Sequence, residues 1–184
     1  MKANVLAKAN AFKGMNEIAL RGEIVIYGST YLSNFPFYEL ANRCHLEHAI
    51  YNRSIETLTA EEAEELLNLC VLDIAPRKIF LQLGEEDAEK ETVIQYYQTI
   101  LQRIRTGLPC AKIYLLGLSQ DTPDGVPFNQ KLQSFTDGKH IFYIPFSENC
   151  ANRKHLYTDQ FKQLCQYFRD GSINLLDAFE MADL

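Results

Sequence analysis

The feature that most constrains the fold of this chain is a series of short, continuous apolar runs separated by helical patterns. Runs of this kind are typical of strands that are buried on both faces, as in a parallel sheet. The predicted strands are residues 23–28, 45–52, 78–84, 112–118 and 140–146, and the pattern of 45–52 is the weakest of them.

Helical patterns fill the intervals between these runs. Residues 59–70 open with Thr59 and carry Glu62 three positions later, which is the signature of a capping box. Residues 89–106 repeat an apolar residue at helical spacing before Gly107 and Pro109 end the pattern. Two further helices are predicted at 127–135 and at 158–168, the latter with Thr158 as its N-cap.

Alternating strands and helices predict a layered architecture. Right-handed β–α–β crossovers place helices on both faces of a parallel sheet. We therefore expect a three-layer, doubly wound α/β fold with a central, mostly parallel five-stranded sheet. At 184 residues, the chain is expected to form a single domain spanning 1–184.

Charge and composition narrow the function classes. The net charge is −6 and no cluster of Lys and Arg stands out, so we expect neither nucleic acid nor a membrane surface as a partner. The N-terminal residues lack the apolar region of a secretory signal, and no apolar run approaches the length of about 20 residues that spans a bilayer. The five cysteines are widely spaced, which favours free thiols and a cytoplasmic location, with Cys70 and Cys165 packed in the core.

The ends of the predicted strands are where a ligand site is expected, because ligands bind at the carboxyl ends of the strands in open α/β sheets. The first such end, IVIYGST, places Ser29 and Thr30 directly after an apolar run, as hydrolases often place a nucleophile. The other loops of interest are 53–58, 84–88, 118–126 and 147–157.

Five stretches in the right order resemble the SGNH/GDSL-type hydrolases, in the group similar to platelet-activating-factor acetylhydrolase. They are IVIYGSTYLSN, AIYNRSIETLTAEEAEELL, IAPRKIFLQLGEED, YYQTILQRIRTGLPCAKIYLLGLSQ and ENCANRKHLYTDQF, which together cover about residues 20 to 168. The resemblance implies the SGNH hydrolase-like, flavodoxin-like variant of the predicted fold. It also implies ester hydrolysis, of acyl or O-acetyl groups, without a cofactor.

The resemblance also implies a catalytic set that is altered in this chain. The nucleophilic serine falls on Thr30, the base is retained as His155, and the acid that orients the base falls on Asn152. The oxyanion-hole positions fall on Thr30, Thr57 and Glu86. Further pocket candidates are Ser29, Tyr31, Gly84, Glu85 and Asp87.

The chemistry of these changes predicts very slow hydrolysis by the family route. Thr30 keeps a hydroxyl, although its extra methyl group crowds the attack path. Glu86 replaces an amide donor by a carboxylate, which offers only acceptors where negative charge would develop. Asn152 cannot supply the carboxylate that holds the catalytic histidine in the correct tautomer, a change that costs roughly 10⁴ in kcat in the serine-protease example.

Other interpretations of the same residues stay open. His155 could be a helix-start histidine with a local hydrogen bond, and residues 85–87 could be solvated charges at a helix N-terminus. No metal site is assigned, because residues 85–87 lack further ligands at an obvious spacing. Cys44, His45 and His48 are likewise left without a metal, since two residues three apart on a strand point to opposite faces.

Three functions therefore compete. The first is a weak or inactive hydrolase that acts by binding a small ester or carbohydrate-like ligand. The second is an active esterase or deacetylase with Thr30 or Ser29 as nucleophile, His155 as base, and Glu148, Asp159 or a carboxylate of residues 85–87 as the orienting acid. The third is an assembly protein that uses the C-terminal extension 171–184, which could pack on its own domain or form a homodimer.

Overall fold

The computed structural model describes residues 1–43, 46, 48–119, 124–145 and 156–169. The five strands form one sheet in the order β2-β1-β3-β4-β5, and every pair of neighbours is parallel. The strands are β1 (Ile24–Gly28), β2 (Ile50–Asn52), β3 (Lys78–Gln82), β4 (Lys112–Leu116) and β5 (Ile141–Ile144). The expected doubly wound α/β fold is confirmed.

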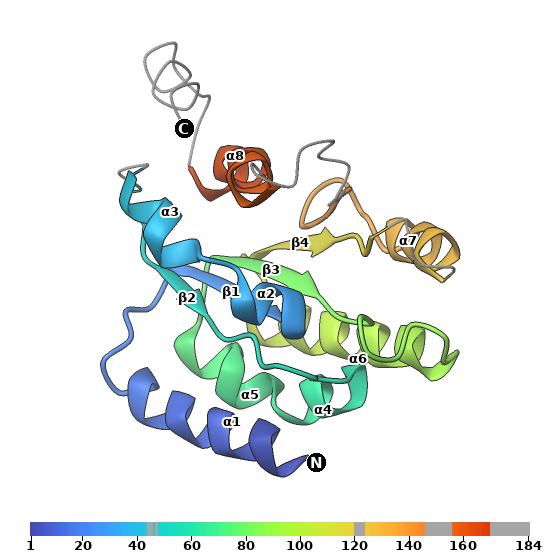
Figure 1. The fold of residues 1–184 in the computed structure, drawn as a ribbon, viewed down its shortest axis with the longest axis horizontal. Coiled ribbons are helices and arrows are strands. Elements are labelled where there is room, and N and C mark those ends of the chain that lie inside the picture. The colour runs from blue at the N-terminus through green and yellow to red at the C-terminus, as the bar shows by residue number, and fades with distance from the viewer. Residues whose placement is uncertain (44–45, 47, 120–123, 146–155, 170–184) are drawn as a thin grey trace.

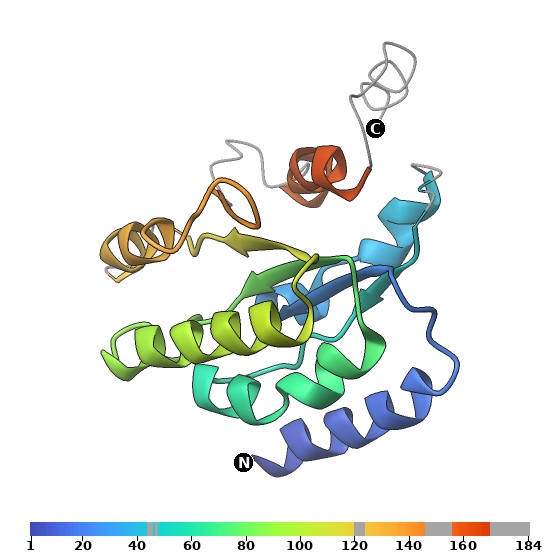
Figure 2. The same ribbon diagram turned by 180° about the vertical axis from the view of Figure 1, so that it is seen from behind.

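Helices lie on both sides of this sheet (Figures 1 and 2). They are α1 (Ala3–Asn16), α2 (Thr30–Asn34), α3 (Phe37–Arg43), α4 (Ala60–Glu65), α5 (Leu67–Cys70), the 3₁₀ turn η1 (Leu72–Ile74), α6 (Thr92–Gly107), α7 (Gly125–Gln133) and α8 (Leu156–Phe168). The predicted helix 59–70 is two short helices, but its capping box is present, with the Thr59 hydroxyl accepting from the Glu62 N–H. The prediction that Thr158 caps α8 is wrong, because the helix begins at Leu156.

The strands build two cores because alternate side chains point to opposite faces of a sheet. Val25 and Tyr27 of β1 join the core that α1, α4, α5 and α6 cover, and α7 also contributes to it. Ile24 and Ile26 join the core under α2, α3 and α8. Strands buried on both faces explain why the sequence shows continuous apolar runs.

The two cysteines that were predicted to pack in the core lie in different cores. Cys70 is buried in the first core and Cys165 in the second, as expected from the sequence. Burial raises the pKa of the Cys70 thiol to about 12. Cys110 is exposed.

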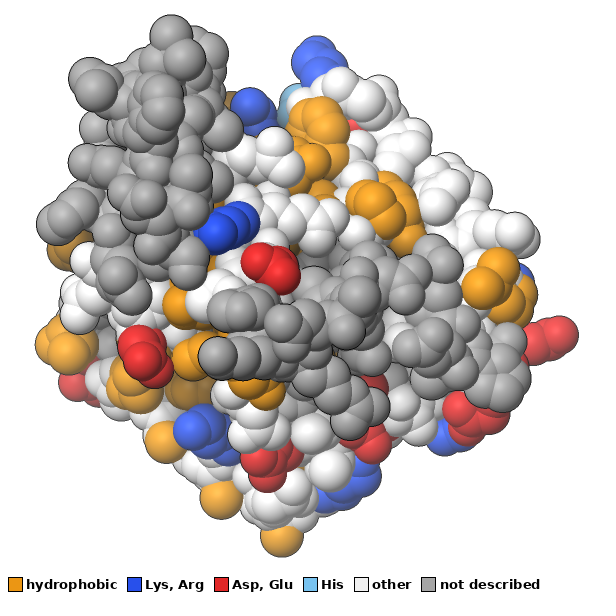
Figure 3. Space-filling view, turned by 45° about the horizontal axis from the view of Figure 1, so that its top comes forward, with side chains coloured by type: hydrophobic (Ala, Val, Ile, Leu, Met, Phe, Trp, Pro, Cys, Tyr) orange, Lys and Arg blue, Asp and Glu red, His pale blue; other side chains and the backbone are white. Residues whose placement is uncertain are grey.

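The surface carries both signs of charge. On the face shown in Figure 3, acidic and basic side chains are interspersed among hydrophobic ones wherever the residues are described. Within the described ranges, no helix has the length and apolar character needed to cross a membrane.

Candidate functional site

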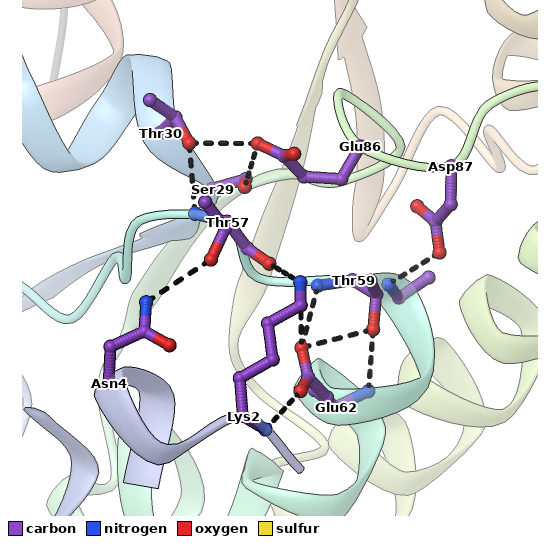
Figure 4. Close-up of polar contacts among 10 residues, drawn as sticks. Lys2, Asn4, Ser29, Thr30, Thr57, Thr59, Glu62, Glu86 and Asp87 are labelled. Carbon is purple, nitrogen blue, oxygen red and sulfur yellow. Dashed lines mark hydrogen bonds and ion pairs between the residues drawn. The ribbon is translucent and has the colours of Figure 1, made fainter. Parts of the chain in front are cut away.

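The site lies at the carboxyl ends of β1, β2 and β3, where three of the predicted loops meet (Figure 4). Thr30 is the first residue of α2, directly after β1. Thr57 belongs to the loop that follows β2, and Glu86 belongs to the loop that follows β3. The structure therefore brings together the residues onto which the resemblance places the nucleophile and two oxyanion-hole positions.

Gly28, the last residue of β1, lies very close to the backbone of β3. A Cβ at Gly28 would lie 2.5 Å from the backbone oxygen of Gln82 and 2.8 Å from Cδ1 of Leu32. Only glycine fits at such a distance from a neighbouring backbone. The absence of a side chain lets the end of β1 turn into α2 while staying against β3.

The Thr30 hydroxyl is held by two hydrogen bonds. It donates to Oε1 of Glu86 at 2.8 Å and accepts from the backbone N–H of Thr57 at 2.9 Å. The buried Ser29 hydroxyl donates to the same glutamate oxygen at 3.3 Å. Glu85 accepts from the backbone N–H of Tyr31 at 2.9 Å. The two glutamates thus engage donors at the start of α2.

Thr57 has an unusual backbone conformation. Its φ is +60°, in the left-handed region that disfavours β-branched residues. Figure 4 shows two side chains from the N-terminal segment at this residue: Lys2 donates to the Thr57 carbonyl oxygen, and Asn4 donates to its hydroxyl at 3.3 Å. These contacts hold the residue whose backbone N–H donates to Thr30.

Glu62 fixes Lys2 in turn. It accepts from the backbone N–H of Lys2 at 2.8 Å, and its carboxylate lies 3.6 Å from the Lys2 ammonium. Burial opposes ionisation of Glu62, but the hydrogen bonds from Lys2 and Thr59 outweigh it and lower its pKa. The capping box of α4 and the N-terminal segment therefore share one carboxylate.

Asp87 is buried next to the site. Its Oδ2 accepts from the backbone N–H of Ala60 at 3.1 Å, at the start of α4. Its Oδ1 is buried without a hydrogen-bond partner among the described residues. Burial raises the pKa of Asp87, and the bond from Ala60 only partly offsets this.

Gly84 and Tyr31 border the site on its other sides. Gly84 has φ +97°, and a Cβ there would lie 2.6 Å from the Phe128 ring, so this turn requires glycine. The Tyr31 hydroxyl bonds to Oε1 of the buried Gln160 in α8, and its ring centroid lies 6.4 Å from that of Tyr157. Helix α8 thus packs beside α2.

Several predicted site residues lie outside the described residues. They are His155, Asn152 and Glu148, together with the extension 171–184. Asp159 is described and is exposed in the first turn of α8. Among the described residues, no group of three or more His, Cys, Asp or Glu side chains is placed to hold a metal ion.

Two features of the site could not be predicted from any sequence pattern. Lys2 and Asn4 contact Thr57 across 55 and 53 positions of sequence, a separation that leaves no local pattern. A cavity of about 360 Å³ also lies beside the site, between α1, α2 and the loop after β2. It is lined by Asn4, Lys8, Ser33, Asn34, Ile55 and Glu56. We refer to it as the polar cavity.

Comparisons with known proteins show the fold. No family model and no curated protein matches the sequence. A solved structure from Streptococcus pneumoniae, named as a platelet activating factor, has a TM-score of 0.77 at 17% identity, over 90% of this chain and 93% of that chain. A GDSL-like lipase from Bacteroides thetaiotaomicron has a TM-score of 0.62 at 9% identity, over 96% and 94%.

A third solved structure agrees with these two. A structure from Bacteroides fragilis, named as an acylhydrolase, has a TM-score of 0.64 at 10% identity, over 75% of this chain and 76% of that chain. The described elements and these likenesses show that the chain has an SGNH/GDSL hydrolase-like α/β fold. At such low identity the likeness establishes the fold, and activity has to be argued from the site.

Proposed function

We propose that this chain is an SGNH/GDSL hydrolase-like protein whose ester-hydrolysing site is degraded, and that it acts by binding a small ester or carbohydrate-like ligand. The observation that carries the proposal is the position of Glu86. Its carboxylate accepts a hydrogen bond from the Thr30 hydroxyl at 2.8 Å, so it lies next to the group that would attack an ester.

Electrostatics explains why this contact opposes hydrolysis. Attack on an ester carbonyl creates an oxyanion, which needs hydrogen-bond donors about 2.7–3.1 Å away. A carboxylate at that point offers acceptors and adds a like charge. The backbone N–H of Thr57 is a suitable donor, but it already donates to Thr30. Loss of one oxyanion donor alone costs about 10² to 10³ in rate.

The first test is hydrolysis of p-nitrophenyl acetate and p-nitrophenyl butyrate. We expect the wild type, Thr30→Ala and His155→Ala to match the uncatalysed rate. Turnover by the wild type that both variants abolish would overturn the proposal, because it would reveal a working nucleophile and base.

A reversion experiment sharpens this test. The triple variant Thr30→Ser, Glu86→Asn, Asn152→Asp restores the residue types that the resemblance implies at these positions. We expect it to hydrolyse the esters at least about 100-fold faster than the uncatalysed background, the value of one recovered oxyanion donor. The control Glu89→Asn changes an exposed glutamate outside the site and should leave the rate at background. An unchanged rate in a folded triple variant would argue against a hydrolase ancestry of this site.

Binding requires its own measurement. The backbone amide signals of Thr30 and Thr57 can be followed by NMR during titration with triacetin, as a small ester, and with N-acetylglucosamine, as a carbohydrate. Saturable shifts with either probe support the binding half of the proposal. No shift with both contradicts it for these ligand classes.

One observation favours the alternative, an active esterase or deacetylase. The carboxylate at 2.8 Å from the Thr30 hydroxyl could accept its proton, as a general base requires. In that case Glu86→Gln abolishes activity that the wild type possesses. Under the main proposal, the wild type has no activity to lose.

A further inference from the structure

We propose that the polar cavity is a binding site for a small zwitterionic molecule of the amino-acid type. This inference is independent of the proposed function, because no residue that lines the cavity belongs to the group formed by Thr30, Thr57 and Glu86. Its volume of about 360 Å³ falls in the range of about 300–1,000 Å³ that is usual for small-molecule sites.

Two opposite charges flank the cavity. Lys8 on α1 and Glu56 in the loop after β2 are both exposed. In the described part of the chain, neither has an ion-pair partner within 4.0 Å. The Lys8 ammonium lies 5.5 Å from the centroid of the Phe12 ring. A cation and an anion that line one cavity without pairing to each other can both be neutralised by a ligand that carries both charges.

Two carboxamides line the cavity in fixed orientations. Asn4 donates through Nδ2 to the Thr57 hydroxyl at 3.3 Å, and Asn34 donates through Nδ2 to the Thr30 carbonyl oxygen at 3.0 Å. These bonds hold the two side chains, while no described residue donates to the Oδ1 of either. Carboxamide oxygens are good acceptors for an ammonium group.

The chemistry of the lining selects the ligand class. The six lining residues carry one positive and one negative charge, so their sum matches a net-neutral ligand. An α-amino acid meets this requirement with its carboxylate toward Lys8 and its ammonium toward Glu56 and the carboxamide oxygens. A neutral sugar would leave both charges uncompensated, and none of the lining side chains is aromatic, so no ring is available for stacking.

The test uses L-glutamine as the probe and the full chain labelled for NMR. We expect saturable shifts of the amide signals of Asn4, Ser33, Asn34 and Glu56, at concentrations up to about 20 mM, above the millimolar dissociation constants of weak complexes. Lys8→Met and Glu56→Gln should each weaken binding at least about fivefold, and added salt should weaken it further. The matched controls Lys13→Met and Glu17→Gln change exposed charges outside the cavity and should bind as the wild type does.

Three results would overturn the inference. The first is no shift with L-glutamine at about 20 mM, above the affinity of a weak site. The second is a shift with D-glucose but none with L-glutamine, which would point to a polyol site. The third is equal binding by Lys8→Met, Glu56→Gln and wild type, with thermal unfolding confirming that the variants fold. None of these variants alters the residues probed in the esterase assays, so failure here leaves the proposed function untouched.

Discussion

Thr57 shows what a single residue contributes to the site. It adopts φ +60° with a β-branched side chain, although left-handed backbone costs a residue other than glycine about 1–2 kcal/mol. Contacts from Lys2 and Asn4 hold this conformation. The resemblance places a glycine at this position, and the backbone conformation is one that glycine adopts freely.

Replacing Thr57 by glycine should therefore stabilise the protein. We expect Thr57→Gly to raise the free energy of unfolding by about 0.5–1 kcal/mol, because the relieved strain exceeds the entropy that glycine adds to the unfolded state. Urea denaturation measures the change. Ala75→Gly, at the other non-glycine residue with positive φ among those described, is the control and should gain less, since alanine is not β-branched. A destabilised Thr57→Gly variant would show that the Asn4 contact outweighs the strain.

Glu62 gives a prediction on pH. Its pKa in the folded state is lowered from the usual 4.5, so its contribution to stability is present above that value and is lost as the pH falls through the folded pKa. Glu62→Gln should lower the free energy of unfolding by about 1 kcal/mol at pH 7. The difference from wild type should shrink as the pH falls from about 4.5 through the lowered folded-state pKa, below which both carry a neutral side chain. A pH-independent difference would assign the loss to packing.

The positions of some of these residues can be predicted from the sequence, and those of others cannot. The meeting of Thr30, Thr57 and Glu86 could be anticipated because each follows a strand of one parallel sheet, and those ends share an edge. The roles of Lys2 and Asn4 could not, since they depend on how α1 packs in three dimensions. The polar cavity was missed for the same reason, because its lining comes from three separate segments.

Among the elements, the strands were predicted well and the N-terminal helix was not. The four stronger runs each contain a strand, and the weakest, 45–52, contains the short β2. Helix α1 buries only Val5, Ala9 and Phe12, and its other positions mix alanine, lysine and exposed apolar residues. Such a helix has almost no amphipathic pattern to detect. Helices α2 and α3 are short and follow one another closely, so they offer few turns of periodicity.

One buried lysine joins an element of the sheet to a helix. Lys78, the first residue of β3, donates to the carbonyl oxygens of Tyr167, Phe168 and Arg169 at 2.8, 3.1 and 2.8 Å. It therefore satisfies the free carbonyl groups at the C-terminus of α8, where a positive charge also suits the helix dipole.

Removing this ammonium should loosen α8. We expect Lys78→Met to lower the free energy of unfolding by about 3 kcal/mol, because hydrogen bonds to a charged group are lost and buried carbonyls lose their donor. Guanidinium denaturation measures the loss. Lys112 occupies the paired position on β4 but is exposed, so Lys112→Met is a matched control that should change stability little. Equal effects of the two substitutions would refute the capping role.

At the scale of the whole molecule, the two cores share one sheet. Every strand contributes side chains to at least one core, and β1, β3, β4 and β5 contribute buried residues to both. If the strands separate from the helices that cover one core, the side chains of the other core lose part of their packing as well. The two layers should therefore unfold together as one cooperative unit.

Cysteine labelling tests this coupling. Cys70 reports on the first core and Cys165 on the second, while the exposed Cys110 should react in the native protein. We expect iodoacetamide to label Cys70 and Cys165 with the same denaturant midpoint, measured peptide by peptide by mass spectrometry. Burial and the raised pKa of Cys70 keep its thiol unreactive until unfolding. Two separate midpoints would mean that the layers open independently.

The docking of α1 has a consequence for synthesis on the ribosome. Asn4 meets Thr57 across 53 positions, so the helix emerges long before the loop and helices that cover it. At about 5–20 residues per second, that interval lasts roughly 3 to 10 s. A single short helix is marginal in water on its own. The nascent α1 segment, with Val5, Ala9 and Phe12 not yet buried, is therefore expected to be accessible to chaperones throughout that interval.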